Sequence, residues 1–179
     1  YIVTESETKA LKLINDSTKK IYDFGILTGC GATNNSIAEL GPKRRTVVEH
    51  LVSKGFSVNV IKGWKETRDK EMAKCYAILN IHGQLNINEN LWQDSRIFEH
   101  LRCDRLVAAG FRILSETCDH LDYNQYKLDM VKFIDYAQFK EIENTTNVIE
   151  IGKSESESES KSKIAKVWKS IQCSQSAIK

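Results

Sequence analysis

The chain has 179 residues, which is enough for one domain of about 150 residues and an appendage. Lys and Arg number 26 against 24 Asp and Glu, a near balance that does not indicate a general binder of nucleic acid or membrane surfaces. An apolar content of 41% excludes a wholly disordered chain. No apolar run approaches the roughly 20 residues that span a bilayer, so we expect no membrane span. Because the chain begins with Tyr1 rather than Met, we expect a fragment or a processed protein.

The first elements alternate between a helical and an extended pattern. Residues 1–20 are polar with a weak helical pattern, and we interpret them as the end of a preceding element. Residues 22–28 form a short apolar run before a Gly-Cys-Gly turn, which is typical of a buried strand. Pro42 suits the first turn of a helix, and apolar residues recur at helical spacing from there to Gly55.

The same alternation continues to residue 135. In chain order, the pattern predicts a strand at 56–61, a helix at 65–74, a strand at 76–81, a helix at 96–109, and strands at 111–115 and 131–135. Strands separated by single helices indicate β-α-β units and a parallel sheet, and right-handed crossovers place helices on both faces. We therefore expect one Rossmann-like α/β domain over residues 21–152.

The C-terminal part differs in composition from this domain. Residues 153–163 are rich in Ser and Glu and lack the apolar surface that folding needs, which predicts a flexible linker. Residues 164–179 carry apolar side chains at helical spacing, among them Val167 and Trp168. We expect a helix there that docks on this domain or on another one.

The five cysteines are odd in number and form no C-x-x-C motif, so they do not resemble a disulfide framework or a metal site. We interpret them as reduced thiols of a cytoplasmic protein. Cys75 and Cys103 lie in apolar stretches and are expected to be small core residues. We expect no metal site, because His, Cys and carboxylate residues show no metal-ligand spacing.

Candidate binding residues follow from the rule that ligands of such sheets lie at the carboxyl ends of the strands. Gly29 ends the first predicted strand, where backbone N–H groups can hold a phosphate or simply make a turn. Arg44 and Arg45 begin the next helix, and paired guanidinium groups suit a diphosphate, although a solvated helix face explains them too. His82 ends the most apolar strand, as a ligand-binding side chain or as a structural cap.

Two more candidates share the predicted helix 96–109. Glu99 borders its apolar stripe, where a carboxylate can accept both hydroxyl groups of a ribose. Arg102 lies three residues further on, so a simple intrahelical salt bridge is the alternative. Arg68 and Asp69 are adjacent in the chain and are interpreted as surface residues of an earlier helix.

Taken in order, these residues resemble the donor-binding, C-terminal half of glycosyltransferases with the GT-B architecture. Within them, the pattern is similar to glycosyltransferase-like proteins of large DNA viruses and a spore-maturation-like bacterial family. The blocks that carry the resemblance are Lys43-Arg44-Arg45, Gly63-Trp64 with Arg68-Asp69, Ile78-Leu79-Asn80-Ile81-His82, Phe98-Glu99 with Arg102, Leu106 and Gly110, and Ile113-Leu114-Ser115-Glu116.

The resemblance implies a nucleotide-sugar as substrate, with no separate cofactor. It places Glu99 on the donor ribose, Arg44 or Arg45 near the diphosphate beside Gly29, and His82 close to the sugar. It also implies a hexosyltransferase-type reaction that needs an N-terminal half as a partner domain, with the sugar and the acceptor undetermined. The alternative is a non-catalytic module, for nucleotide binding or protein interaction, that keeps the fold without the reaction.

Overall fold

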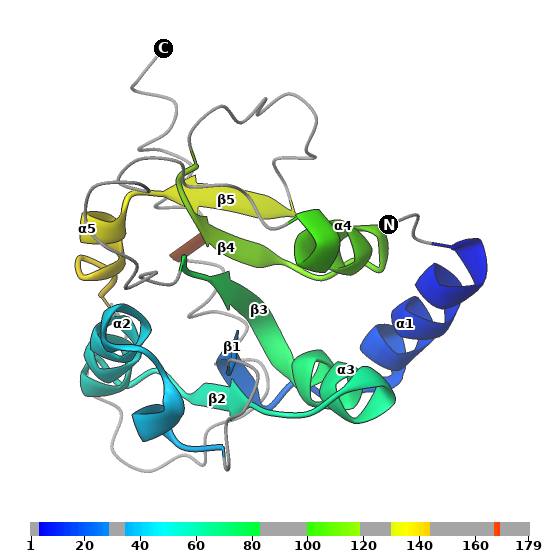
Figure 1. Ribbon diagram of the computed structural model, residues 1–179, viewed down its shortest axis with the longest axis horizontal. Coiled ribbons are helices and arrows are strands. Elements are labelled where there is room, and N and C mark those ends of the chain that lie inside the picture. Colours follow the sequence, from blue (N-terminus) through cyan, green and yellow to red (C-terminus); the bar gives the residue numbers. More distant parts are fainter. Residues whose placement is uncertain (1–3, 29–34, 83–99, 119–129, 144–166, 169–179) are drawn as a thin grey trace, which may run out of the picture.

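The computed structural model of the chain describes residues 4–28, 35–82, 100–118, 130–143, 167 and 168. Its helices are α1 (Glu5–Ser17), α2 (Pro42–Ser53), α3 (Lys65–Ala73), α4 (His100–Ala108) and α5 (Tyr136–Phe139), with a 3₁₀ helix η1 (Ile37–Glu39). Its strands are β1 (Tyr22–Leu27), β2 (Val58–Ile61), β3 (Cys75–Asn80), β4 (Ile113–Glu116) and β5 (Val131–Ile134) (Figure 1).

The five strands form one sheet in the order β2-β1-β3-β4-β5, and every neighbouring pair is parallel. The chain therefore builds outward from β1 to β2, crosses back to β3 on the other side of β1, and continues to β5. The direction of winding reverses between β1 and β3, which is the switch point of a doubly wound sheet. This confirms the predicted α/β, Rossmann-like fold class.

Helices cover both faces of the sheet (Figure 1). Strand side chains alternate between the faces. Those of Phe24, Ile26, Ala77 and Leu79 enter a core with α2 and α5, while those of Ile78 and Ile113 enter a second core with α1, α3 and α4. The two apolar clusters thus lie on opposite sides of one sheet, as the crossover rule predicts.

Helix α1 packs on the second of these cores. A capping box between Thr4 and Glu7 starts it, and Leu11 faces α3 and α4. Near its end, the Asn15 side chain donates to the carbonyl of Ala109. Lys20 follows α1 and donates to the carbonyl of Ala73, and burial lowers the pKa of its ammonium group. The sequence suggested that residues 1–20 are the end of a preceding element. The described part of this segment contacts the domain.

The described residues of the C-terminal segment also contact the domain. Val167 and Trp168 are buried in the core that contains α2 and α5, and the Arg112 guanidinium lies 5.9 Å from the Trp168 ring centroid. The expected docking of this segment is thus seen at these two residues. The predicted linker, residues 153–163, lies outside the described residues. None of the described helices is long and apolar enough to cross a membrane.

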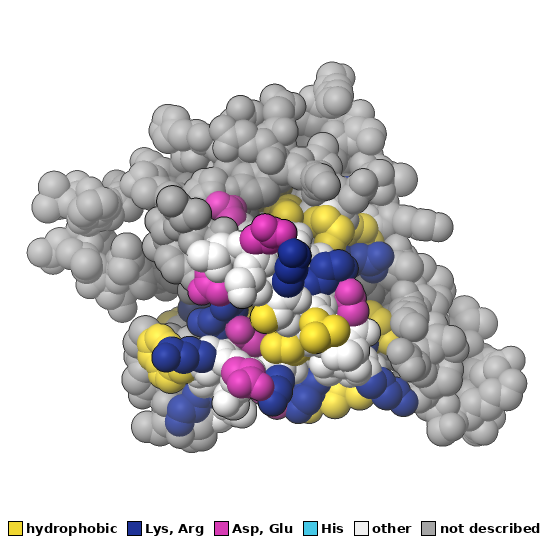
Figure 2. All heavy atoms as spheres, turned by 90° about the vertical axis from the view of Figure 1, so that its right-hand side faces the viewer, with side chains coloured by type: hydrophobic (Ala, Val, Ile, Leu, Met, Phe, Trp, Pro, Cys, Tyr) yellow, Lys and Arg dark blue, Asp and Glu magenta, His cyan; other side chains and the backbone are white. Residues whose placement is uncertain are grey.

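The surface over α1, α3 and α4 carries both signs of charge. Figure 2 shows Lys and Arg side chains interspersed there with Asp and Glu and with small apolar areas. Several of these charges form exposed ion pairs within one helix, such as Lys9 with Glu5 and Lys70 with Glu66. Pairs of this kind contribute little to stability, so this face is best described as an ordinary solvated surface.

Candidate functional site

The carboxyl ends of β1 and β3 meet at the switch point of the sheet. Thr28 directly follows β1, and both its backbone N–H and its hydroxyl group donate to the carbonyl of Ile61 at the end of β2. On the other side, Ile26 pairs with Leu79, so continuing this register puts Thr28 level with Ile81. This edge is the place where ligands of doubly wound sheets bind.

The N-terminus of α2 lies at this edge. Its N-cap residue, Gly41, offers no side-chain hydrogen bond, Pro42 takes the first helical position, and no acidic residue lies in the first turn. Three basic residues occupy the following positions, beginning with Lys43. Cations at the positive end of a helix dipole destabilise the isolated helix, and an anion bound at such a helix start is favoured.

Lys43 links this helix start to the end of β4. Its Nζ donates to Oε1 of Glu116 at 2.5 Å, and the Glu116 side chain is 1% exposed. The ammonium group also lies 4.8 Å from the ring centroid of Tyr136, whose hydroxyl group donates to the Lys43 carbonyl. A buried carboxylate requires such a partner, so this ion pair fixes the first turn of α2 against β4 and α5.

Glu116 also orients the end of β3. Its Oε2 accepts the backbone N–H of His82 at 3.0 Å. The His82 ring is buried, with Nε2 3.2 Å from Sγ of Cys118, and the thiol of Cys118 donates to the Glu116 carbonyl. His82 is therefore at the strand end that the sequence predicted, and it is held there by Glu116 and Cys118.

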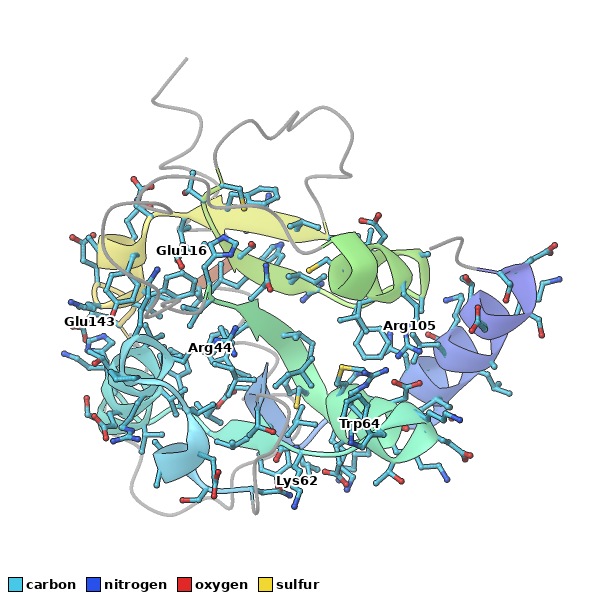
Figure 3. The ribbon with its side chains drawn as sticks, viewed as in Figure 1. Arg44, Lys62, Trp64, Arg105, Glu116 and Glu143 are labelled. Carbon is cyan, nitrogen blue, oxygen red and sulfur yellow. The ribbon has the colours of Figure 1, made fainter. Side chains whose placement is uncertain are left out.

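The two predicted arginines lie on different sides of the helix start. The Nε atom of Arg44 donates to the Ile81 carbonyl at 2.8 Å, which places this side chain between α2 and the end of β3 (Figure 3). Arg45 turns away, and its Nη2 donates to the carbonyl groups of Ala38 and Leu40 in and after η1. Arg44 is thus the one of the pair that reaches the switch point.

Three further predicted residues cannot be placed in this way. Gly29 and Glu99 lie outside the described residues, and so does the side chain of Arg102, whose backbone belongs to α4. Helix α4 follows β3, so its N-terminal end lies at the carboxyl edge of the sheet in a right-handed crossover. The roles that the resemblance implies for these three residues stay predictions.

The end of β2 has an unusual backbone. Gly63 has a φ of +125° and Lys65 has a φ of +49°, a conformation that residues with a side chain rarely adopt. Between them, Trp64 is extended and serves as the N-cap residue of α3 without a side-chain hydrogen bond. Its side chain is 69% exposed.

One sequence-based interpretation is wrong. Asp69 was expected on the surface, yet it is 8% exposed and accepts a hydrogen bond from Nη2 of Arg105 in α4. Arg68 contacts the same carboxylate oxygen at 3.4 Å. Two helices that cover one face of the sheet bring Asp69 and Arg105 together, a contact that spacing within one helix does not reveal. This pair lies in the contact between α3 and α4 and is structural.

The described thiols are core residues. Cys75, Cys103 and Cys118 are free and buried, which confirms the prediction for the first two. Burial raises the pKa of the Cys75 thiol to about 12, so this group stays protonated and unreactive at neutral pH. Within the described ranges, no group of three or more His, Cys, Asp and Glu residues is arranged to hold a metal ion.

Sequence reasoning did not select Glu116, Lys43 or Cys118 as site residues. One feature of the sequence could have pointed to Glu116. It is a carboxylate at the end of an apolar strand, and a charge in such a position is tolerated only when it has a partner. Its partner Lys43 lies 73 residues earlier, so the pairing depends on the strand order and not on any local pattern.

Comparison with known proteins gives viral relatives of greater length. Uncharacterized protein L137 of Acanthamoeba polyphaga mimivirus is 34% identical over 143 residues, which is 77% of this chain and 17% of L137. Uncharacterized proteins L140 and L138 of the same virus are each 30% identical, over 76% and 77% of this chain. The chain spans 40% of L140 and 14% of L138, so in each case it matches one part of a longer protein.

These relatives confirm the expected similarity to viral proteins, and their names state no activity. No model of a known protein family matches the chain, and no solved structure matches it.

Proposed function

We propose that this domain binds the diphosphate group of a nucleotide-sugar donor and is the donor-binding half of a glycosyltransferase. The observation that carries the proposal is the start of α2, which is uncapped and basic at the switch point of the sheet. Backbone N–H groups, the helix dipole and a guanidinium group then act on the same anion.

The surrounding contacts support a preorganised site. Lys43 and Glu116 fix the first turn of α2 to β4, and Arg44 is held against the last residues of β3. An anion that enters this edge therefore meets the Arg44 guanidinium and a helix start that are already in position, which reduces the reorganisation that binding requires.

The chemistry of sugar transfer suits such a site. The acceptor oxygen forms a bond to the anomeric carbon, the bond from that carbon to the diphosphate oxygen breaks, and the acceptor proton passes to a base. Negative charge develops on the departing nucleoside diphosphate, where Arg44 and the N-terminus of α2 stabilise it. The acceptor and the base belong to the partner half that the resemblance implies.

Calorimetry with UDP, GDP and ADP tests the proposal. We expect one of these nucleotides to bind the protein, and Arg44→Gln to weaken its affinity about tenfold, the effect of one charge-assisted hydrogen bond. Arg44→Lys keeps the charge and should lose less. Lys9→Gln removes an exposed charge from α1 and is the matched control, with no change expected.

A folded protein that binds none of the three nucleotides would contradict the proposal. If the wild type and Arg44→Gln bind the nucleotide with equal affinity, Arg44 does not contribute to the binding site. Nucleotide binding without sugar transfer, in the presence of the complete partner half, would favour the non-catalytic module instead.

A further inference from the structure

A thiol and an imidazole are in contact where β3 and β4 end. Nε2 of His82 lies 3.2 Å from Sγ of Cys118, and the two residues are 8% and 5% exposed. The contact joins residues that are 36 positions apart in the chain. Histidine is a common proton acceptor for nucleophilic thiols, so this thiol–imidazole pair offers more than a cysteine that only fills a core.

The thiol–imidazole pair lies on the face of the sheet opposite to α2. Cys118 packs in the core that contains α3 and α4, whereas the Glu116 carboxylate contacts Lys43 in the first turn of α2. The two sides of this edge therefore carry different chemistry. Basic groups at a helix start occupy one side, and a thiol with a proton acceptor occupies the other.

Hydrogen bonds connect the thiol to other buried polar groups at the ends of both strands. The carbonyl oxygen of Glu116 accepts from the Cys118 thiol at 3.4 Å and from the Ser115 hydroxyl group at 3.0 Å. Oγ of Ser115 in turn accepts from Nδ2 of Asn80 at 3.0 Å. Oδ1 of Asn80 is buried and has no hydrogen-bond partner among the described residues. Native cores leave few polar atoms unpaired, so this polar cluster is not explained by packing alone.

The proton of the Cys118 thiol has two acceptors within reach. The Glu116 carbonyl accepts the hydrogen bond without removing the proton. The imidazole of His82 can take the proton on Nε2 and then donate it back to the thiolate as a charge-assisted hydrogen bond. The thiolate is the nucleophilic form of cysteine, so the imidazole is the group that can activate this sulfur.

Cys75 is an internal reference for a buried thiol that faces a carbonyl group. Its Sγ lies 3.5 Å from the carbonyl oxygen of Glu71, and the residue is 2% exposed. Burial raises the pKa of this thiol to about 12. Cys75 and Cys118 are thus similarly buried, and the contact with an imidazole distinguishes the second from the first.

We infer that Cys118 is a site of oxidation to sulfenic acid by hydrogen peroxide, activated by His82. The inference goes beyond the proposed function, because it concerns the other face of the sheet and involves no nucleotide. The thiolate sulfur attacks one peroxide oxygen, and an S–O bond forms as the O–O bond breaks. The departing oxygen takes the proton from Nε2 of His82, so the sulfur is oxidised and the peroxide is reduced to water. The low exposure of Cys118 favours a small oxidant of this kind.

Peroxide treatment of the full chain, with dimedone present to trap sulfenic acids, tests the inference. Mass spectrometry follows the labelled fraction of each cysteine with time. In the wild type, Cys118 should be labelled at least about tenfold faster than Cys75. His82→Gln removes the proton acceptor and should slow the labelling of Cys118 about tenfold or more. His50→Gln is the matched control with no change expected, because the His50 ring contacts the Ile142 carbonyl.

The His82 variant separates activation from exposure, since the smaller glutamine leaves Cys118 at least as accessible to peroxide. Labelling of Cys118 no faster than that of Cys75 overturns the inference, and this comparison within the wild type needs no variant. An unchanged rate in His82→Gln, with folding verified by circular dichroism, overturns it as well, and so does an equal loss in His50→Gln. The assay contains no nucleotide, so its failure leaves the proposed function standing, and a failure of nucleotide binding leaves the thiol site standing.

Discussion

Gly25 lies in the middle of β1, where the sheet leaves no room for a side chain. A Cβ atom at this position would be 2.7 Å from Sγ of Cys75, 2.9 Å from Cδ1 of Ile61 and 3.0 Å from Cδ1 of Ile78. These three residues belong to the two strands on either side of β1, and all are buried. The glycine therefore allows neighbouring side chains to close over the central strand.

Gly25→Ala is expected to lower the free energy of unfolding by about 1–3 kcal/mol, the usual penalty for overpacking a core. Urea denaturation followed by circular dichroism measures the change. Gly41→Ser is the control, because a Cβ atom there meets nothing within 4 Å and serine is a good N-cap residue. An alanine at position 25 without loss of stability would show that Cys75 and its neighbours relax freely.

At the scale of elements, the contact between α3 and α4 depends on a charged pair. Asp69 and Arg105 are joined by a hydrogen bond, and their side chains are 11% and 15% exposed. The helices cover the same face of the sheet with Met72 and Leu106 beneath them. Removing Asp69 leaves the largely buried Arg105 without this partner, and removing Arg105 leaves Asp69 with only the longer contact to Arg68 at 3.4 Å.

Asp69→Asn and Arg105→Gln should each destabilise the protein by about 2 kcal/mol, and the double variant should lose less than their sum. The double-mutant cycle is measured by urea denaturation. Glu66→Gln breaks an exposed pair with Lys70 on α3 and should leave the stability unchanged within error. Strictly additive losses at positions 69 and 105 would contradict a direct coupling.

The sequence predicted the strands, but it did not predict the side-chain contacts between elements, for a physical reason. Strands such as β3 were predictable because each is a short apolar run that ends at a turn. His82 was predictable as an edge residue because it follows such a run. The pairing of Lys43 with Glu116 was not predictable, because it depends on β4 lying beside β3 in the folded sheet. Asp69 was misplaced for the same reason, since its partner is 36 residues away.

At the scale of the whole molecule, one sheet separates two apolar cores. Leu51 of α2 lies fully buried in one core, and Leu11 of α1 is 2% exposed in the other. The strands contribute alternate side chains to both cores. Loss of packing on one face therefore weakens the same strands on which the other core packs. The two faces should therefore unfold together and not as separate units.

Leu11→Ala and Leu51→Ala test this cooperativity. Each is expected to lower the free energy of unfolding by about 2–5 kcal/mol, the range for a large cavity in a core. Circular dichroism follows the whole domain, while fluorescence includes Trp168, which is buried on the face of Leu51. For both variants, the two signals should shift to the same lower urea concentration. If Leu11→Ala shifts the dichroism but leaves the fluorescence midpoint in place, α1 and its core form an independent unit.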